Sequence, residues 1–489
     1  TGGYREHSAA TRDLTNGKFK LPVASGLLTL VVNTLDQPEA QDPQGLSRAD
    51  VAANPRQVAP TAYTFNTRKS VRQNQAGLVY EFETDARNQF QARVYAGDRQ
   101  VTQYLAIPLN VQQAATHSGG VVDLDRGYGG AGLRWTRALV EGDRPLTLTG
   151  GLDYDRQAEN RKGYLNNNGI AAALKRDERD IVSSTDAYAQ LEWRMTERWS
   201  AAAGMRHSRV RFDSQDYFTA NGNDSGAVSF VKTNPVAGAV YRITPMWSAY
   251  ANVGRGFETP TFAELAYRPG NQTGLNFALQ PSTSLHKEVG LKGRLASATR
   301  VNLALFHINT SNEIVVNAAT GGRTDYKNAP GTRRQGIEAS WESKLPAGFE
   351  AYASYTRLDA EFTQPFTSSG ALVPAGSKLA GVPQNSLFGE VVWRHARSGF
   401  HAGAEVRSAG RIFVDDRNSE AADAYTIANL RAGFEQRGKA WRLTEFVRVD
   451  NVTDRRYVGS VIVADTNRRF YEPAPGRNYL VGITASHRF

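Results

Sequence analysis

All seven tryptophans of this 489-residue chain lie within a few residues of a short polar turn. An indole ring is apolar but carries one N–H donor, so it favours the level at which lipid tails meet water. A water-soluble core would place its tryptophans without regard to turns. Tryptophans at the same end of successive hairpins therefore predict an aromatic girdle on a membrane-spanning β-barrel. The residues of this girdle are Trp135, Trp193, Trp199, Trp247, Trp341, Trp393 and Trp441.

Composition excludes membrane-spanning helices but not membrane-spanning strands. The mean hydropathy is -0.47, and no apolar run approaches the roughly 20 residues that a transmembrane helix needs. A transmembrane strand needs only about 9–11 residues and turns only alternate side chains to lipid, so average hydropathy does not reveal it. The chain has no cysteine, which excludes disulfides and cysteine-ligated metals. The net charge of +10 is spread along the chain, which favours solvated loops and a polar lumen over nucleic-acid binding.

Short turns and long polar stretches alternate from one end of the chain to the other. Bacterial outer-membrane barrels have this pattern, with short periplasmic turns and longer extracellular loops. No segment resembles a linker to a second globular domain. The nine short turns are predicted at 16–17, 85–87, 142–143, 196–197, 244–245, 296–297, 346–347, 397–398 and 437–438. The long loops are predicted within 36–74, 157–185, 213–233, 257–285 and 363–378.

Apolar and polar residues alternate along the segments between the turns, most clearly near the C-terminus. Tyr479, Val481 and Ile483 share one face of the last predicted strand, and Gly482 and Thr484 lie on the other. In lipid, only a closed barrel satisfies every backbone group of a sheet. The apolar face is therefore expected to point outward, and the fold class is all-β, a large antiparallel transmembrane β-barrel.

The number of turns predicts the number of strands. Nine short turns join eighteen strands, and the strand that ends at Phe489 makes about nineteen. Single-chain bacterial barrels have even strand numbers because both chain ends lie in the periplasm. An odd count leaves two interpretations: at least one strand precedes Thr1, or one hairpin within 36–74 is miscounted.

Four segments and the final residue resemble, in this order, elements of the TonB-dependent receptors. These are 22-stranded outer-membrane importers of ferric siderophores and related scarce ligands. The segments are 252–265 (NVGRGFETPTFAEL), 279–292, 328–338 and 449–458 (VDNVTDRRYV), and the chain ends at Phe489. One departure is Ser282, which stands where the family usually has an acid after proline.

The resemblance implies that residues 1–489 are the barrel domain of such a receptor, about nineteen of its 22 strands. It places the N-terminal plug domain, the TonB box and the first strands upstream of Thr1. It implies a monomer in the outer membrane of a Gram-negative bacterium, in contact with lipopolysaccharide and other outer-membrane lipid. TonB, with ExbB and ExbD, would act through the missing N-terminal region, and Phe489 would present the assembly signal to the barrel-assembly machinery.

The implied function is TonB-dependent uptake of a ferric siderophore or similar metal chelate, without enzyme activity, catalytic residues or a cofactor. A passive porin and a structural or adhesion barrel remain alternatives. The strand number argues against a porin, because a lumen of this width is too wide to leave open safely. Codons upstream of Thr1 would discriminate: a plug with a TonB box selects the importer.

Arginines lie beside aromatic residues in the predicted extracellular loops. Guanidinium groups can bind anionic chelates, and aromatic rings can contact flat catecholate or hydroxamate groups. The same residues could instead brace the loops or contact lipopolysaccharide phosphates. The candidate ligand-binding residues are Tyr63, Arg68, Arg161, Tyr164, Tyr267, Arg268, Arg411, Arg468, Arg469 and Tyr471. Phe65 and Phe413 are further aromatic residues beside these arginines.

Three other patterns do not indicate a site. Segment 127–132 fits the G-x-G-x-x-G pattern, but it continues into strand-like alternation instead of the helix that a dinucleotide fold needs. The histidines at 286, 307 and 401 are isolated from other metal ligands. The acidic residues at 415, 416 and 423 lack the spacing of a calcium loop. No metal site is predicted.

Overall fold

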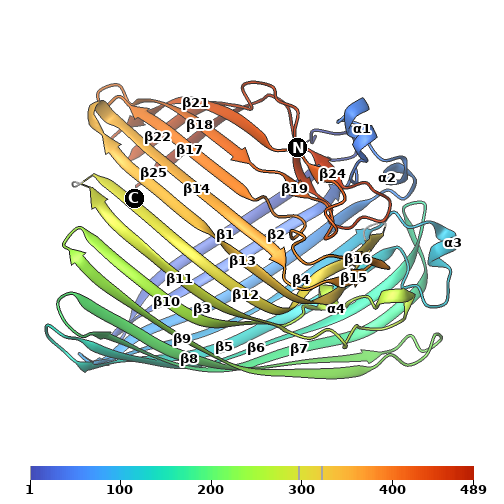
Figure 1. The fold of residues 1–489 in the computed structure, drawn as a ribbon, viewed down its shortest axis with the longest axis horizontal. Coiled ribbons are helices and arrows are strands. Elements are labelled where there is room, and N and C mark those ends of the chain that lie inside the picture. Colours follow the sequence, from blue (N-terminus) through green and yellow to red (C-terminus); the bar gives the residue numbers. More distant parts are fainter. Residues whose placement is uncertain (1, 296–297, 321–322, 489) are drawn as a thin grey trace.

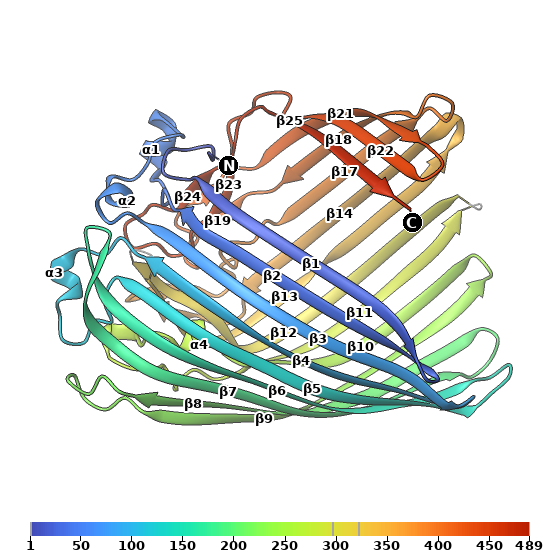
Figure 2. The same cartoon turned by 180° about the vertical axis from the view of Figure 1, so that it is seen from behind.

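The computed structural model describes residues 2–295, 298–320 and 323–488, and its main feature is one antiparallel sheet of 19 strands. Figures 1 and 2 show this sheet rolled into a barrel whose strands run obliquely. Short turns lie at one end, and longer connections with small helices lie at the other. Within the described residues, no helix is long and apolar enough to cross a membrane. The large antiparallel β-barrel predicted from the sequence is confirmed.

The strands of the main sheet are 10 to 25 residues long. They are β1 (Ala10–Val23), β2 (Gly26–Gln41), β3 (Arg68–Asp85), β4 (Asn88–Tyr104), β5 (Val121–Val140), β6 (Leu146–Asn167), β7 (Ile170–Arg194), β8 (Trp199–Asp216), β9 (Gly226–Thr244), β10 (Trp247–Glu258), β11 (Ser282–Leu295), β12 (Thr299–Thr320), β13 (Arg323–Leu345), β14 (Phe349–Phe362), β17 (Asn385–Arg394), β18 (Phe400–Ala409), β21 (Tyr425–Arg437), β22 (Trp441–Asp450) and β25 (Asn478–His487).

The remaining elements are short. The helices are α1 (Arg48–Ala53), α2 (Pro60–Thr64), α3 (Leu109–Gln112), α4 (Phe262–Leu265), η1 (Pro269–Asn271) and η2 (Pro346–Gly348). The minor strands are β15 (Phe366–Ser368), β16 (Ala371–Val373), β19 (Ile412–Phe413), β20 (Ala421–Ala422), β23 (Val458–Val461) and β24 (Tyr471–Pro473).

Each strand of the main sheet pairs with its neighbours in sequence, which gives an up-and-down meander. β1 pairs with β2 and β25 pairs with β22, and no pairing between β1 and β25 is found among the described residues (Figure 2). The 19 strands agree with the number predicted from the turns.

Seven of the nine predicted short turns lie between strands as expected, and an eighth, at 296–297, falls outside the described residues. The turn predicted at 16–17 is wrong. Gly17 pairs with Val32 inside a continuous ladder, and the chain reverses instead at Ala24, which has a φ of 51°. Asn-Gly is a strong local turn signal. Here the pairing of β1 with the apolar run at the start of β2 sets the register instead.

The long loop predicted within 157–185 is also wrong in extent. β6 continues to Asn167 and β7 begins at Ile170, so only a tight turn at Asn168 and Gly169 separates them. Arg161 therefore lies on a strand. This part of the hairpin is polar on both faces because it extends beyond the apolar belt that faces lipid. Polarity alone therefore does not distinguish such a strand from a loop. By contrast, the loop predicted within 257–285 is confirmed between β10 and β11.

Strand alternation separates an outer apolar face from an inner polar one. Val481 and Ile483 are about 70% exposed on the outside. On the inside, Arg206 forms ion pairs with Asp153 and Asp186 at 3.4 and 3.2 Å. All seven tryptophans lie in the strand ends next to the short turns, so their common level is observed, while their role as a lipid girdle remains a prediction. Phe489 lies outside the described residues.

Candidate ligand-binding site

Loop 259–281, which joins β10 to β11, is anchored to the inner wall of the barrel. A capping box begins its helix α4: the Glu264 carboxylate accepts a hydrogen bond from the Thr261 N–H at 2.7 Å, and the Thr261 hydroxyl accepts one from the Glu264 N–H at 3.3 Å. Phe262 packs edge-on against Phe212 of β8, with ring centroids 5.2 Å apart. Both rings belong to a buried cluster, which holds the loop against β8 and β9.

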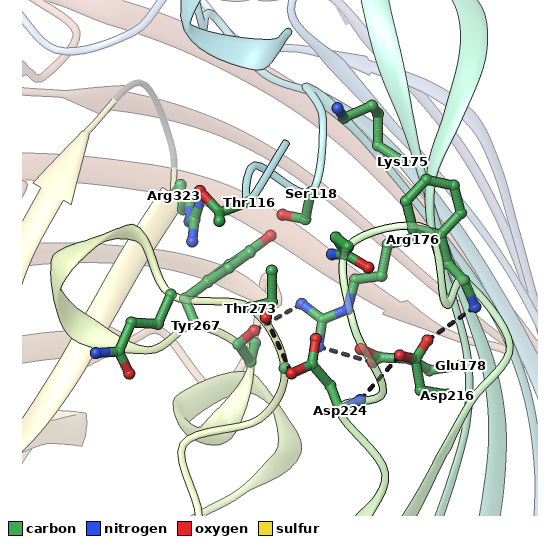
Figure 3. Close-up of a pocket in the computed structure, with 15 residues that line it drawn as sticks. Thr116, Ser118, Lys175, Arg176, Glu178, Asp216, Asp224, Tyr267, Thr273 and Arg323 are labelled. Carbon is green, nitrogen blue, oxygen red and sulfur yellow. Dashed lines mark hydrogen bonds and ion pairs between the residues drawn. The ribbon is translucent and has the colours of Figure 1, made fainter. Parts of the chain in front are cut away.

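This anchoring places Tyr267 among three arginines from three strands. The guanidinium carbon lies 4.2 Å from the ring centroid for Arg323 of β13, 5.4 Å for Arg161 of β6 and 5.8 Å for Arg176 of β7. Figure 3 shows Tyr267 between Arg323 and Arg176. β13 is not a neighbour of β6 or β7 in the sheet. The inward fold of the loop therefore creates this arrangement, which we call the Tyr267 cluster (Tyr267, Arg161, Arg176 and Arg323).

The Tyr267 cluster has buried hydrogen-bond donors that lack acceptors. Arg176 forms an ion pair with Glu178, with 2.7 Å between Nη2 and Oε2, but the approach is not aligned for a hydrogen bond. Within the described residues, Nε of Arg176 and Nη1 of Arg323 are also buried without a partner. Leaving such groups unpaired is costly, so an incoming oxygen acceptor would be bound favourably there.

Two titratable groups report the positive potential of this region. Burial alone would raise the pKa of the Tyr267 hydroxyl, but the charges of Arg161, Arg176 and Arg323 outweigh burial and hold that pKa below its ordinary value. Burial, with the charges of Arg323 and Lys175, lowers the pKa of His117 to about 4. A phenol that ionises more easily and a histidine that stays neutral both indicate a region suited to anions.

Tyr267 fills most of the space among these arginines. The cavity that remains has a volume of about 20 Å³, which is enough for little more than one water molecule. Thr116, Ser118 and Asn221 line it together with Arg176 and Arg323. The Oδ1 atom of Asn221 is also buried and has no partner in the described part of the chain. A chelate could reach the guanidinium groups only if Tyr267 moved.

A second arginine–aromatic group lies in the C-terminal loops, and here each charge has a partner. Glu420 forms ion pairs with Arg48 and Arg468, and it accepts a hydrogen bond from the Tyr471 hydroxyl at 2.9 Å. Arg48 also donates to the Tyr471 hydroxyl at 2.7 Å. We call these four residues the Glu420 cluster. A groove of about 470 Å³ lies beside it, and Asp416 is among the residues that line the groove.

The structure brings together only some of the residues predicted to bind ligand. Arg161 and Tyr267 meet in the Tyr267 cluster, and Arg468 and Tyr471 meet in the Glu420 cluster. Arg469 donates to the Thr61 hydroxyl at 2.9 Å and so ties two loops together.

The other predicted residues are dispersed. The Tyr63 hydroxyl donates to Glu6 at 2.8 Å, and the Arg68 guanidinium stacks 3.6 Å from the Tyr104 ring centroid. The last three residues belong to neither cluster. Arg268 donates to the Thr273 carbonyl at 3.3 Å, Tyr164 is half-buried on β6, and Arg411 is exposed. Ligand binding by any of these residues remains a prediction.

Sequence reasoning missed Arg176 and Arg323, which complete the Tyr267 cluster. Arg176 has no aromatic neighbour in sequence, and Arg323, although Tyr326 follows three residues later, lies outside the predicted long loops, so the search for arginines beside aromatics in those loops selected neither. A capping signal was present, since Thr261 and Glu264 have the spacing of a capping box. It indicated the start of a helix but not the direction in which the loop folds. In the part of the chain that the structure describes, no cluster of three or more His, Asp or Glu could hold a metal ion.

Comparison with known proteins identifies the family. A family model described as "TonB dependent receptor-like, beta-barrel" matches residues 19–452, which is most of the chain. The chain belongs to this family. Its members are receptors of the Gram-negative outer membrane, so this chain is an outer-membrane barrel.

Solved receptor structures share the fold over nearly the whole chain. The unliganded ferric citrate transporter FecA matches with a TM-score of 0.80 at 20% identity, covering 98% of this chain and 71% of that one. The ferric yersiniabactin uptake receptor FyuA from Yersinia pestis matches with a TM-score of 0.72 at 17% identity, covering 98% and 71%. At these identities the likeness shows the fold.

Curated relatives match over shorter segments. The pesticin receptor of Yersinia enterocolitica is 24% identical over 298 residues, 58% of this chain and 41% of the relative. The ferrioxamine receptor of the same species is 26% identical over 189 residues, 37% of this chain and 25% of the relative. The chain thus spans less than half the length of these relatives.

Proposed function

We propose that this chain is the barrel of a receptor that takes up a ferric siderophore or similar metal chelate in a TonB-dependent manner. The family match over residues 19–452 carries this proposal. Relatives named for ferric citrate, ferric yersiniabactin and ferrioxamine support the ligand class. In the full-length protein, TonB with ExbB and ExbD would supply the energy through an N-terminal plug domain and its TonB box, with the long-loop end of the barrel facing the medium.

The Tyr267 cluster supplies a binding mode for an anionic chelate. Its three guanidinium groups are the residues best placed to contact carboxylate, phenolate or hydroxamate oxygens, because Arg176 and Arg323 carry donors without acceptors in the described part of the chain and Arg161 faces the same ring. In the structure, the Tyr267 ring occupies the position that such a group would take. We propose that ligand binding displaces Tyr267 and pairs the ligand oxygens with Arg161, Arg176 and Arg323.

Uptake of radioactive iron tests the transport proposal. Cells that lack their own receptors would express the full-length protein and receive ferric citrate, ferrioxamine or ferric yersiniabactin as separate probes. Binding to the cell surface should be saturable for one of these chelates and should not require TonB. Accumulation should stop when TonB is deleted or the proton gradient is collapsed, because a filled lumen passes a chelate only when energy is supplied.

The control is the same strain with an empty vector. Accumulation that is linear in concentration, unsaturable and independent of TonB would contradict the proposal and favour a passive channel. Failure of all three probes to bind would contradict the proposed ligand class.

A further inference from the structure

Three buried carboxyl groups lie on the two strands that supply Arg161 and Arg176 to the Tyr267 cluster. They are Glu159 of β6 and Glu178 and Asp180 of β7. They share a face with those arginines, because side chains an even number of residues apart point to the same side of a strand. The register places Glu159 directly opposite Asp180. Like charges directly opposite each other destabilise a strand pair, and two neighbouring carboxyl groups raise the pKa of one of them.

Each of these opposed carboxyl groups has one oxygen with a partner and one without. The Arg126 guanidinium on β5 donates to Oε2 of Glu159, and the Ser214 hydroxyl on β8 donates to Oδ1 of Asp180 at 2.6 Å. Within the described residues, Oε1 of Glu159 and Oδ2 of Asp180 are buried without a hydrogen-bond partner. A buried carboxylate oxygen that no donor reaches is costly to keep charged, and a proton removes that charge.

Asp180 is the carboxyl group best placed to hold this proton. Burial, reinforced by the negative charge of Glu178, raises its pKa to about 6. The Ser214 hydroxyl and the positive charges of Arg176 and Arg161 act in the opposite direction but do not outweigh burial. The charged and titratable groups that face it are Arg126 on β5, Glu159 and Arg161 on β6, Arg176 and Glu178 on β7, Asp216 on β8 and Tyr267 of loop 259–281.

We propose that Asp180 is a proton switch for the Tyr267 cluster, which takes up a proton from the medium when an anion binds there and releases it when the anion leaves. This inference rests on the proposed function, because it assigns a regulation to the same arginines. An anion bound to Arg161 and Arg176 uses the positive charge that would otherwise compensate an ionised Asp180. The neutral acid is then favoured, so the anion and the proton stabilise each other's binding.

This linkage determines the direction of the pH dependence. In the empty cluster the pKa of Asp180 is about 6, and a bound anion would raise it further. Below about pH 6 the carboxyl group is protonated in both states, so its charge does not change the affinity for the anion. At higher pH the empty protein loses the proton first, and the affinity falls by up to about tenfold per pH unit until the complex ionises as well.

Equilibrium binding of ferric citrate to the full-length protein in detergent, between pH 5.5 and pH 8, tests the inference. Wild type should bind about tenfold more tightly at pH 5.5 than at pH 8, because one proton accompanies the anion. Asp180→Asn is neutral at every pH, so it should bind at pH 8 nearly as tightly as at pH 5.5. Ferric citrate itself titrates, so the variants are compared with wild type at each pH.

Two further variants sharpen this comparison. Asp186→Asn is the matched control: Asp186 lies further along the same face of β7, is buried and pairs with Arg206, and this variant should keep the wild-type pH profile. Ser214→Ala removes a donor to the ionised form of Asp180, so it should move the pH profile toward higher pH. Heat-modifiable gel mobility confirms that each variant is folded.

Ionisation of Tyr267 tests the coupling without a chelate. The difference in ultraviolet absorbance between each protein and its Tyr267→Phe counterpart measures the pKa of this phenol. Asp180→Asn removes a negative charge from beside Arg161 and Arg176, so it should lower the pKa of Tyr267, whereas Asp186→Asn should leave that pKa unchanged.

An unchanged pKa of Tyr267 in Asp180→Asn would overturn the inference, as would parallel pH profiles of ferric citrate binding for this variant and wild type. If no form of the protein binds ferric citrate but the pKa of Tyr267 falls in Asp180→Asn, the result would count against the proposed ligand class while supporting the coupling of Asp180 to the cluster.

Discussion

The Tyr267 cluster and the Glu420 cluster lie at the same end of the barrel and contain the same residue types, but their charges are compensated differently. In the Glu420 cluster, one carboxylate contacts both Arg48 and Arg468 and accepts from Tyr471. In the Tyr267 cluster, three guanidinium groups surround a phenol, and some of their donors have no acceptor. The position of a carboxylate therefore distinguishes a brace between loops from a site available to an anionic ligand.

This difference bears on both interpretations of the arginines in the loops. The contacts of the Glu420 cluster fit the bracing interpretation, because its arginines already have partners. The contacts of the Tyr267 cluster fit the ligand interpretation, because within the described residues Nε and Nη2 of Arg176 and Nη1 of Arg323 have no hydrogen-bond partner, even though Arg176 also forms an ion pair with Glu178.

The largest expected effect contrasts arginine pairs from the two regions. Arg161→Gln/Arg323→Gln should weaken binding of the chelate that the receptor transports on the order of a hundredfold, because each charged hydrogen bond contributes about 1.5–3 kcal/mol. Arg468→Gln/Arg469→Gln should change it less than about threefold, because Arg468 is exposed and already paired with Glu420 and Arg469 is hydrogen-bonded to Thr61. Equilibrium binding to whole cells measures both, and similar losses in the two variants would remove the distinction between the clusters.

The second effect concerns how each loop is anchored. Phe262→Ala removes a buried ring from the cluster under loop 259–281 and should cost about 3–5 kcal/mol of local stability. Limited proteolysis should then cut this loop in preference to others. Val414→Ala is the matched change in the C-terminal loops, where Val414 is fully buried, and it should sensitise its own loop and leave 259–281 intact. Cleavage in the same loop in both variants would contradict independent anchoring.

The third effect tests the carboxylate of the Glu420 cluster. Glu420→Gln should speed hydrogen exchange in residues 462–470 by a few-fold, because Arg48 and Arg468 lose their counter-charge but remain partly solvated. Hydrogen bonding from Arg468 holds the pKa of Glu420 below its ordinary value. A lowered carboxyl pKa contributes stability above the unfolded value of about 4.3 and loses it as the pH falls through the folded value. Wild-type exchange should approach that of the variant only below about pH 4.

The smallest effect is a contrast in titration. His117, beside the Tyr267 cluster, has a pKa of about 4 and should stay neutral between pH 7 and 5.5. Its depressed pKa contributes stability that is complete above about 6.5 and is lost progressively as the pH falls from there through 4. Asp416, beside the Glu420 cluster, has a pKa raised to about 6, chiefly by burial. Its contribution to stability is present below about 3.9 and is lost as the pH rises through 6.

Nuclear magnetic resonance of selectively labelled protein measures both titrations. Asp416 should titrate near pH 6, and His117 should show no midpoint above pH 5. A His117 midpoint near 6.5 would contradict the burial of this side chain and the positive charges of Arg323 and Lys175 beside it.

The sequence alone determined the sheet. Side chains alternate with a period of two along a strand, and turn residues mark the ends, so local patterns predicted about nineteen antiparallel strands and the common level of the tryptophans. Local sequence signals gave wrong turns and strand ends where pairing with a neighbouring strand sets the structure. The Asn-Gly at 16–17 lies inside a ladder, and residues 157–167 extend β6 although they are polar on both faces.

Tertiary structure alone decided the candidate site. Arg161, Arg176 and Arg323 are far apart in sequence and come from strands that are not all neighbours, and they meet only because Phe262 anchors loop 259–281 inside the barrel. The same residue types with Glu420 between them form a brace instead. Whether an arginine is paired depends on long-range contacts, since ion pairs and hydrogen bonds act over a few ångströms in space and not along the chain. Composition therefore indicated which residue types to examine, and packing determined which of them remained unpaired.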